Sequence, residues 1–108
     1  MRIAFIGCVH FSASMLSMLL EHPEAELVGL VTRDESPFNA DYHDLRLLTK
    51  HTSCPVFLDD NKNQTELAAW LRDRQPDVIY CLGWSYLLSA EVLAVPSMGV
   101  VGYHPAAL

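Results

Sequence analysis

The chain has few cysteines, and they are not spaced as in a metal-binding or redox motif. Its 108 residues contain three of them, Cys8, Cys54 and Cys81. An odd number of cysteines without a Cys-x-x-Cys spacing argues against a disulfide framework. We therefore expect a protein of the reducing cytoplasm, where thiols stay free.

Positive charge is also scarce, and the chain has no long hydrophobic run. It carries 7 Lys and Arg against 13 Asp and Glu, a formal net charge of −6. A nucleic-acid surface needs clustered basic side chains, and the densest group here is Arg72-Asp73-Arg74. The apolar runs are too short to span a membrane. We therefore expect neither a nucleic-acid nor a membrane partner. We also expect no secretory signal, because a strand-like run begins already at residues 2–6.

The chain does contain apolar strand patterns that alternate with amphipathic helix patterns. Strands separated by helices at this spacing predict βαβ units with right-handed crossovers. We therefore predict an α/β, Rossmann-like fold with a mainly parallel sheet of about five strands and flanking helices. The predicted strands are 2–6, 26–32, 55–58, 77–82 and 99–103, and the predicted helices are 11–21, 41–49, 63–74 and 89–93.

One domain should account for all of residues 1–108. Hydrophobic residues make up 51% of the chain, which is enough for one small core, and no linker or repeat divides it. Strand 99–103 reads as buried and needs a covering helix, so we expect the domain to continue past Leu108. Ser12 or Ser14, Asn63 paired with Glu66, and Ser89 are the expected helix caps.

A histidine follows the last predicted strand directly. Pro105 has no backbone N–H and favours an extended residue before it, so strand 99–103 should end near His104. Ligands bind at the carboxyl edge of open α/β sheets. His104 is therefore the main candidate for chemistry, and a purely orienting hydrogen-bonding role is its alternative.

The turn after the first strand, Gly7 to Ser12, lies where a nucleotide-binding turn would lie. It lacks the second and third glycines of G-x-G-x-x-G, and Val9 would crowd a pyrophosphate. A nicotinamide-dependent oxidoreductase is thus an alternative that this turn disfavours. Cys8, His10 and His104 could also converge as zinc ligands or in thiol chemistry, but their spacing is not diagnostic of either.

The segment Trp84-Ser85-Tyr86-Leu87-Leu88 follows Gly83 at the end of the central strand. Its backbone groups and apolar side chains could hold a flat heteroaromatic ring. The alternative is that Trp84 and Tyr86 only cover the edge of the sheet.

Taken in order, these features resemble the amino-terminal domain of the 10-formyltetrahydrofolate-dependent formyltransferases, which act on methionyl-tRNA or on amino sugars. The similarity covers nearly the whole chain, although most of it is generic Rossmann sequence. The specific piece is Gly102-Tyr103-His104-Pro105-Ala106-Ala107-Leu108, which resembles the family's Asn-x-His-Pro-Ser-Leu-Leu-Pro motif. The other matching pieces are 2–7, 28–34, 55–56, 76–79, 87–88, 92–93 with 96, and 99–101.

The resemblance implies transfer of a formyl group from 10-formyltetrahydrofolate to a primary amine, without a metal. His104 would stabilise the oxyanion of the tetrahedral intermediate and assist proton movement. The pterin site would be lined by Trp84, Ser85, Tyr86, Leu87 and Leu88. The amine-bearing substrate would face Cys8, His10, Phe11 and Ser12.

Two positions depart from the family motif, because Gly102 replaces its asparagine and Ala106 its serine. Glycine has no amide to donate to an oxyanion, and losing one such donor costs about 3 kcal/mol of transition-state stabilisation. The family's essential aspartate lies beyond Leu108. We therefore expect this length of chain to be inactive by itself, and a non-catalytic ligand-binding module of the same fold is a further alternative.

The acceptor is predicted by elimination. The acidic balance disfavours a tRNA, and the first turn lacks the glycine-rich, asparagine-bearing loop of members that act on ribonucleotides. We expect a small-molecule amine, such as an amino-sugar nucleotide, and the oligomeric state and pathway stay open.

Overall fold

The computed structural model describes residues 1–36 and 40–103. Within these ranges strands and helices alternate along the chain, and no helix there is long and apolar enough to cross a membrane. The elements are β1 (Arg2–Ile6), α1 (His10–Glu21), β2 (Glu26–Thr32), α2 (Arg46–Thr49), β3 (Val56–Leu58), α3 (Gln64–Arg74), β4 (Val78–Cys81), α4 (Ala90–Leu93) and β5 (Val100–Val101).

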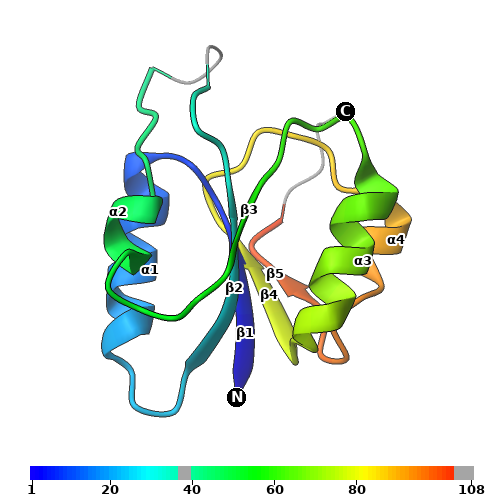
Figure 1. The fold of residues 1–108 in the computed structure, drawn as a ribbon, viewed down its shortest axis with the longest axis horizontal. Helices are drawn as coiled ribbons and strands as arrows, with labels where there is room; N and C mark the ends of the chain where they lie inside the picture. Colours follow the sequence, from blue (N-terminus) through cyan, green and yellow to red (C-terminus); the bar gives the residue numbers. More distant parts are fainter. Residues whose placement is uncertain (37–39, 104–108) are drawn as a thin grey trace.

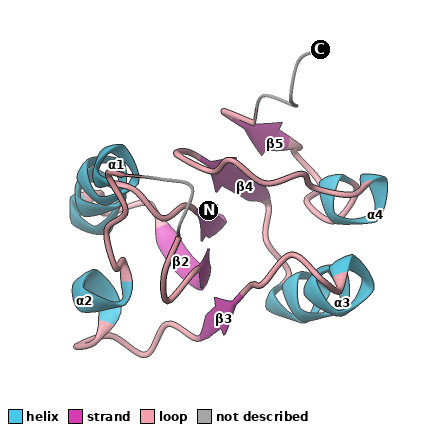
Figure 2. Ribbon diagram, turned by 90° about the horizontal axis from the view of Figure 1, so that it is seen from above, coloured by secondary structure: helices cyan, strands magenta, loops and turns pink. Residues whose placement is uncertain are grey.

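The strands form one parallel sheet in the order β3-β2-β1-β4-β5. Helices α1 and α2 cover one face, and α3 and α4 cover the other (Figures 1 and 2). The α/β, Rossmann-like prediction is confirmed. Strand order reverses between β1 and β4, and open α/β sheets bind ligands where their order reverses, at the carboxyl ends of the strands. These ends lie at the top of Figure 1.

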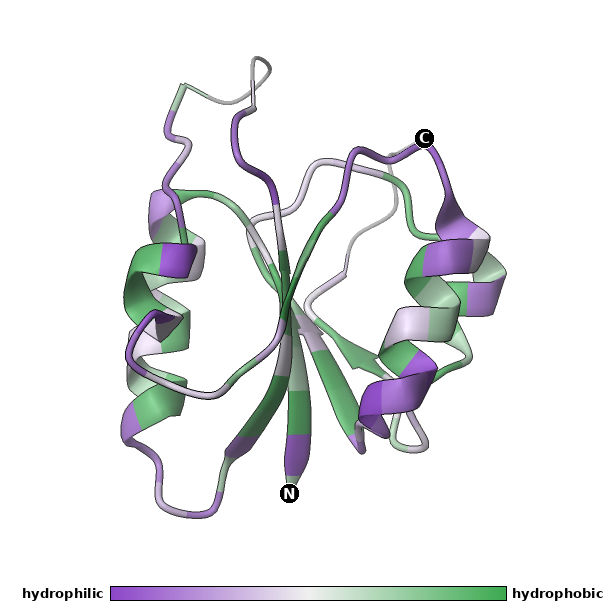
Figure 3. Cartoon of the chain, in the orientation of Figure 1, coloured by the Kyte–Doolittle hydropathy of each residue, from purple (hydrophilic) through white to green (hydrophobic). Residues whose placement is uncertain are grey.

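The sheet has a core on each face because successive strand side chains point to opposite sides. Phe5 and Leu30 pack with Leu16 and Leu45 on the face of α1 and α2. Figure 3 shows that hydrophobic residues dominate the strands, whereas hydrophilic residues are frequent in α3 and in the loops at the upper edge. The core on the other face contains Ala4, Ile6, Val31, Leu67, Ala68, Leu71, Ile79, Cys81, Leu88 and Val92.

Two of the predicted helix caps are confirmed. The Asn63 side chain accepts a hydrogen bond from the backbone N–H of Glu66 at 2.9 Å. The Ser89 hydroxyl accepts one from the N–H of Val92 at 3.2 Å. Each side chain satisfies a backbone donor that the first helical turn leaves free, and so defines where its helix begins.

The predicted helix over 41–49 is largely wrong, because only its last four residues are helical. Tyr42 is extended and forms an isolated antiparallel bridge with Val9. The carboxylate of Asp44 then accepts hydrogen bonds from the backbone N–H of Arg46 at 3.1 Å and from its side chain at 2.9 Å. These contacts start α2 at Arg46 and lower the pKa of Asp44.

The last strand also differs from its prediction. Only Val100 and Val101 belong to β5, which lies at an edge of the sheet, and Val101 is 49% exposed. The expectation of a buried strand over 99–103 is therefore wrong for the described part of the chain. Gly102 ends the strand with a φ of +85°, a conformation that favours glycine.

We expect Gly7→Ala to destabilise the chain strongly. A Cβ at this position would lie 2.4 Å from the carbonyl oxygen of Leu82 and 2.6 Å from the hydroxyl of Ser12. Because the backbone carbonyl of Leu82 cannot shift without disturbing the end of β4, the free energy of unfolding, measured in urea, should fall by about 3 kcal/mol.

Gly99→Ala is the matched control for that substitution. Its φ of +89° strains an alanine backbone, but a Cβ there meets no atom within 4 Å. The loss should stay near ~1 kcal/mol. Equal losses for the two variants would contradict the steric argument.

Candidate functional site

A cavity of about 310 Å³ opens at the carboxyl ends of β1 and β4. This is where the strand order reverses, so it is the candidate ligand site. Another cavity, of about 320 Å³, lies between α1 and the sheet toward the amino ends of the strands and is mostly aliphatic. The lining of the candidate site consists of Val9, Asp41, Cys81, Gly83, Trp84, Ser85 and Gly102.

The first turn is attached to the end of β4 by the hydroxyl of Ser12. This hydroxyl accepts a hydrogen bond from the N–H of Val9 at 3.2 Å and donates one to the carbonyl of Leu82 at 2.6 Å. Val9, not Ser12 or Ser14, is the N-cap of α1, so that cap prediction is wrong. Ser12 is fully buried. Its side chain holds the turn together and does not lie on the surface where a substrate would bind.

Cys8, a residue of this turn, is also buried. Burial raises the pKa of its thiol to about 11, and it raises the pKa of the neighbouring Cys81 thiol to about 12. Both thiols therefore stay protonated at neutral pH, which disfavours thiolate chemistry at Cys8. In residues 1–36 and 40–103, no three His, Cys, Asp or Glu side chains are grouped so that they could hold a metal ion.

The other two residues predicted to face the acceptor lie on the surface. Phe11 is 55% exposed, and the exposed His10 has its ring centroid 4.9 Å from that of His43. The backbone N–H of His10 donates to the carbonyl of Asp41 at 3.1 Å, and that of His43 donates to the carbonyl of Cys8 at 2.9 Å. The stretch around Tyr42 therefore runs along the first turn.

The predicted pterin segment, 84–88, is divided by the structure. Trp84 and Ser85 line the cavity, Leu87 is 62% exposed, and Leu88 is buried in the core beside α3 and α4. The indole N–H of Trp84 is buried and meets no acceptor among the described residues. A buried donor without a partner is costly.

The chain leading to His104 arrives beside this segment. The Tyr103 hydroxyl accepts a hydrogen bond from the N–H of Leu88 at 3.1 Å. A Cβ on Gly102 would lie 2.3 Å from Cδ2 of Leu82, so the backbone packs directly on that side chain. His104 itself, like residues 37–39 and 105–108, lies outside the described residues. Its predicted role stays a prediction.

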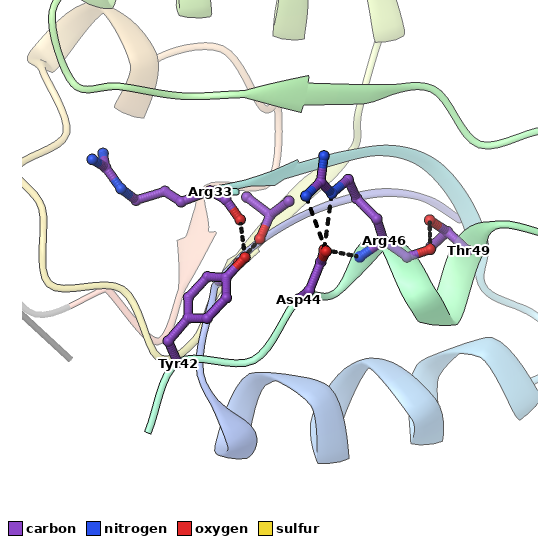
Figure 4. A network of polar contacts seen from close by, with 7 residues as sticks. Arg33, Tyr42, Asp44, Arg46 and Thr49 are labelled. Carbon is purple, nitrogen blue, oxygen red and sulfur yellow. Dashed lines mark hydrogen bonds and ion pairs between the residues drawn. The ribbon is translucent and has the colours of Figure 1, made fainter. Parts of the chain in front are cut away.

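The ends of β2 and β3 carry a polar network that the sequence analysis did not predict. The Arg33 guanidinium donates to the carbonyl of Asp59 at 3.0 Å. The Tyr42 hydroxyl donates to the carbonyl of Arg33 at 2.7 Å (Figure 4). Asp59 is 4% exposed, and its burial raises the pKa of its carboxyl. Ser36 and Tyr86 complete the network with a contact of 2.6 Å between their hydroxyl oxygens.

No spacing in the sequence could have shown this network. Its members come from the connections that follow β2, β3 and β4, and Ser36 lies 50 residues from Tyr86. Only the parallel pairing of the strands brings these loops to one edge.

The chain is similar over its full length to several curated proteins. It is 30% identical to the methionyl-tRNA formyltransferase of Ehrlichia ruminantium (strain Welgevonden) over 116 residues, which cover 100% of the chain and 37% of that protein. It is 29% identical to that of Thermotoga sp. (strain RQ2) over 112 residues, covering 100% of the chain and 36% of the relative. It is 26% identical to the methionyl-tRNA formyltransferase of Magnetococcus marinus over 111 residues, which cover 99% of the chain and 35% of that relative. No family model matches the chain.

The fold and the cavity at the strand reversal define a Rossmann-like ligand-binding domain. The similarity of the whole chain to these relatives supports the formyltransferase family, with the chain corresponding to its amino-terminal domain. The chain spans 35–37% of the length of these relatives.

We expect the buried thiols to resist alkylation in the folded protein. A thiol with a pKa of about 11 is ionised to roughly one part in a thousand at pH 8. Iodoacetamide should label Cys8 only after unfolding. It should label the half-buried Cys54, whose pKa is also raised to about 11, slowly. Peptide mass spectrometry separates the two sites.

The Cys54 rate should rise about tenfold per pH unit between pH 7 and pH 9, because only the thiolate reacts. Labelling in denaturant provides the control. Fast labelling of Cys8 in the folded protein at pH 7 would contradict this expectation and would support thiol chemistry at Cys8.

Proposed function

We propose that this chain forms the donor-binding part of an enzyme that transfers a formyl group from 10-formyltetrahydrofolate to a primary amine. The observation that carries the proposal is the similarity of the whole chain to methionyl-tRNA formyltransferases. The position of the cavity supports it, because the cavity lies where a Rossmann-like sheet binds its ligand. The free thiols of Cys8, Cys54 and Cys81 are compatible with the reducing cytoplasm.

The residues around the cavity fit a folate ring. A pterin is flat and carries nitrogen and oxygen acceptors. Trp84 lines the cavity, and its buried indole N–H meets no acceptor among the described residues. In this proposal Trp84 and Ser85 hold the pterin, and the backbone that continues to Leu88 supports it. The folate supplies the activated formyl group.

His104 is the proposed catalytic residue. As the amine nitrogen bonds to the formyl carbon, negative charge develops on the formyl oxygen, and an imidazole beside it would stabilise that charge. The bond from the formyl carbon to the folate nitrogen then breaks, and the proton lost by the amine is taken up by that leaving nitrogen. His104 is suited to help this transfer because imidazole titrates near neutral pH.

Gly102 favours a second candidate, a non-catalytic module that binds folate. This position corresponds to the asparagine of the family motif, and a Cβ there would lie 2.3 Å from Cδ2 of Leu82, so that side chain would have to move. A side-chain amide from this position therefore cannot stabilise the oxyanion without rearrangement. If the protein is catalytic, a backbone N–H or another side chain has to take that role.

We expect the full-length protein to formylate an amine, and His104→Gln to lower kcat by about 10²–10³. His51→Gln, at an exposed position just after α2, is the control and should retain wild-type activity. The measurement is formyl transfer from 10-formyltetrahydrofolate to a panel of amines. Full activity of His104→Gln would remove the catalytic assignment. Folate binding without transfer to any amine would support the non-catalytic candidate.

The acceptor is proposed to be a small-molecule amine. The net charge of −6 and the scattered lysines and arginines give this part of the protein no basic surface for a polynucleotide. A tRNA acceptor is the second candidate, because the relatives are named for methionyl-tRNA.

Salt dependence should distinguish the two acceptors. For a small amine, kcat/KM should change less than about twofold between roughly 50 and 200 mM salt, because few phosphate contacts are broken. A tRNA held by six or more phosphates would lose about 10³-fold over the same range. Transfer to methionyl-tRNA alone, with that steep dependence, would overturn the small-acceptor proposal.

A further inference from the structure

We propose that Tyr86 is a positioning residue that joins the donor side of the candidate site to its acceptor side. The inference rests on the proposed function, since it assigns Tyr86 a role in aligning the two substrates of the transfer. The donor side is the segment 84–88, and the acceptor side is the first turn together with the stretch around Tyr42 that runs along it.

Both ends of the Tyr86 side chain are held by residues that follow β2. Its hydroxyl oxygen lies 2.6 Å from that of Ser36. The guanidinium carbon of Arg33 lies 4.2 Å from the centre of its ring, in cation–π geometry. On its own loop, the ring contacts Trp84 edge-on, with centroids 5.1 Å apart. Tyr86 is therefore the link between the cavity-lining Trp84 and the end of β2.

The link continues from Arg33 to the acceptor side. The Arg33 guanidinium is fixed by the carbonyl of Asp59 at 3.0 Å, and its own carbonyl accepts from the Tyr42 hydroxyl at 2.7 Å. Figure 4 shows the Arg33 side chain extending away from the Asp44–Arg46 pair, which leaves its charge available to Tyr86. Tyr42 in turn bridges to Val9 of the first turn.

A continuous series of contacts thus runs across the carboxyl edge, from the first turn to the donor segment. Tyr86 joins the loop after β4 to the connection after β2 through Ser36 and Arg33. Arg33 then joins that connection to Asp59, in the loop after β3. All of these residues lie outside the strands and helices. Holding two substrate-binding loops at a fixed separation keeps the reacting groups aligned, and a misplacement of about 1 Å can cost a large part of the rate. This is why the side chain is expected to act on the rate of transfer and much less on binding of the donor alone.

The test is Tyr86→Phe in the full-length protein. Phenylalanine keeps the ring for Arg33 and Trp84 but loses the bond to Ser36. We expect kcat for formyl transfer to fall roughly tenfold, while the dissociation constant of the folate, measured by fluorescence titration, changes less than about twofold and Tm is unchanged. Ser36→Ala should reproduce the fall in kcat, and the double variant should add little to either single change, because both variants lose the contact between the two hydroxyls.

Tyr80→Phe is the matched control. Tyr80 lies in β4 and packs on the face of α1, in the core cluster around Leu16. It should keep wild-type kcat. Arg33→Lys keeps the charge but loses the planar stacking, and it should also lower kcat without weakening folate binding.

A second measurement keeps this inference separate from the proposed function. Amide exchange over residues 84–88 should be about fivefold faster in Tyr86→Phe, as expected when one hydrogen bond that orders a loop is lost. Unchanged exchange, or wild-type kcat in Tyr86→Phe, would overturn the positioning role. A wild type that transfers no formyl group would overturn the proposed function and the catalytic part of this inference, while faster exchange would still support the structural link.

Discussion

The carboxyl edge of the sheet depends on one buried hydroxyl, that of Ser12. It joins the N–H of Val9 to the carbonyl of Leu82, and so ties the turn after β1 to the end of β4. The bridge fits only because the residues on either side have no Cβ: one on Gly83 would lie 2.2 Å from this hydroxyl, and one on Gly7 would lie 2.6 Å from it. The cavity exists where it does because these two strand ends are held together below it.

The sheet could be predicted from the sequence because its signals are local and strong. Apolar runs such as Val78–Cys81 are typical of strands covered on both faces, and side chains such as Asn63 mark helix starts within a few residues. The helix prediction for 41–49 was wrong because the apolar spacing of this stretch is helical, whereas Tyr42 forms a β-bridge with Val9, more than thirty residues earlier. A tertiary contact therefore decided what the local pattern could not.

The site could be predicted in place but not in detail. The strand-end rule locates the ligand edge from the order of strands alone, which is why Trp84 was expected there and does line the cavity. The burial of Cys8 and Ser12 could not be predicted from the sequence, because small side chains occur both on the exposed surface of a turn and in its interior. Contacts such as that of Ser36 with Tyr86 depend on the three-dimensional meeting of loops, and no periodicity encodes them.

The packing of Gly102 on Leu82 has a consequence for how this chain could change over time. With a φ of +85° and Cδ2 of Leu82 only 2.3 Å from where a Cβ would stand, any larger residue at 102 requires a smaller or differently placed side chain at 82. The two positions are therefore an epistatic pair. In an ancestor or descendant that carries the family's asparagine, the Leu82 side chain would have to adopt another position or be replaced, so the residues tolerated at the two positions are coupled by sterics.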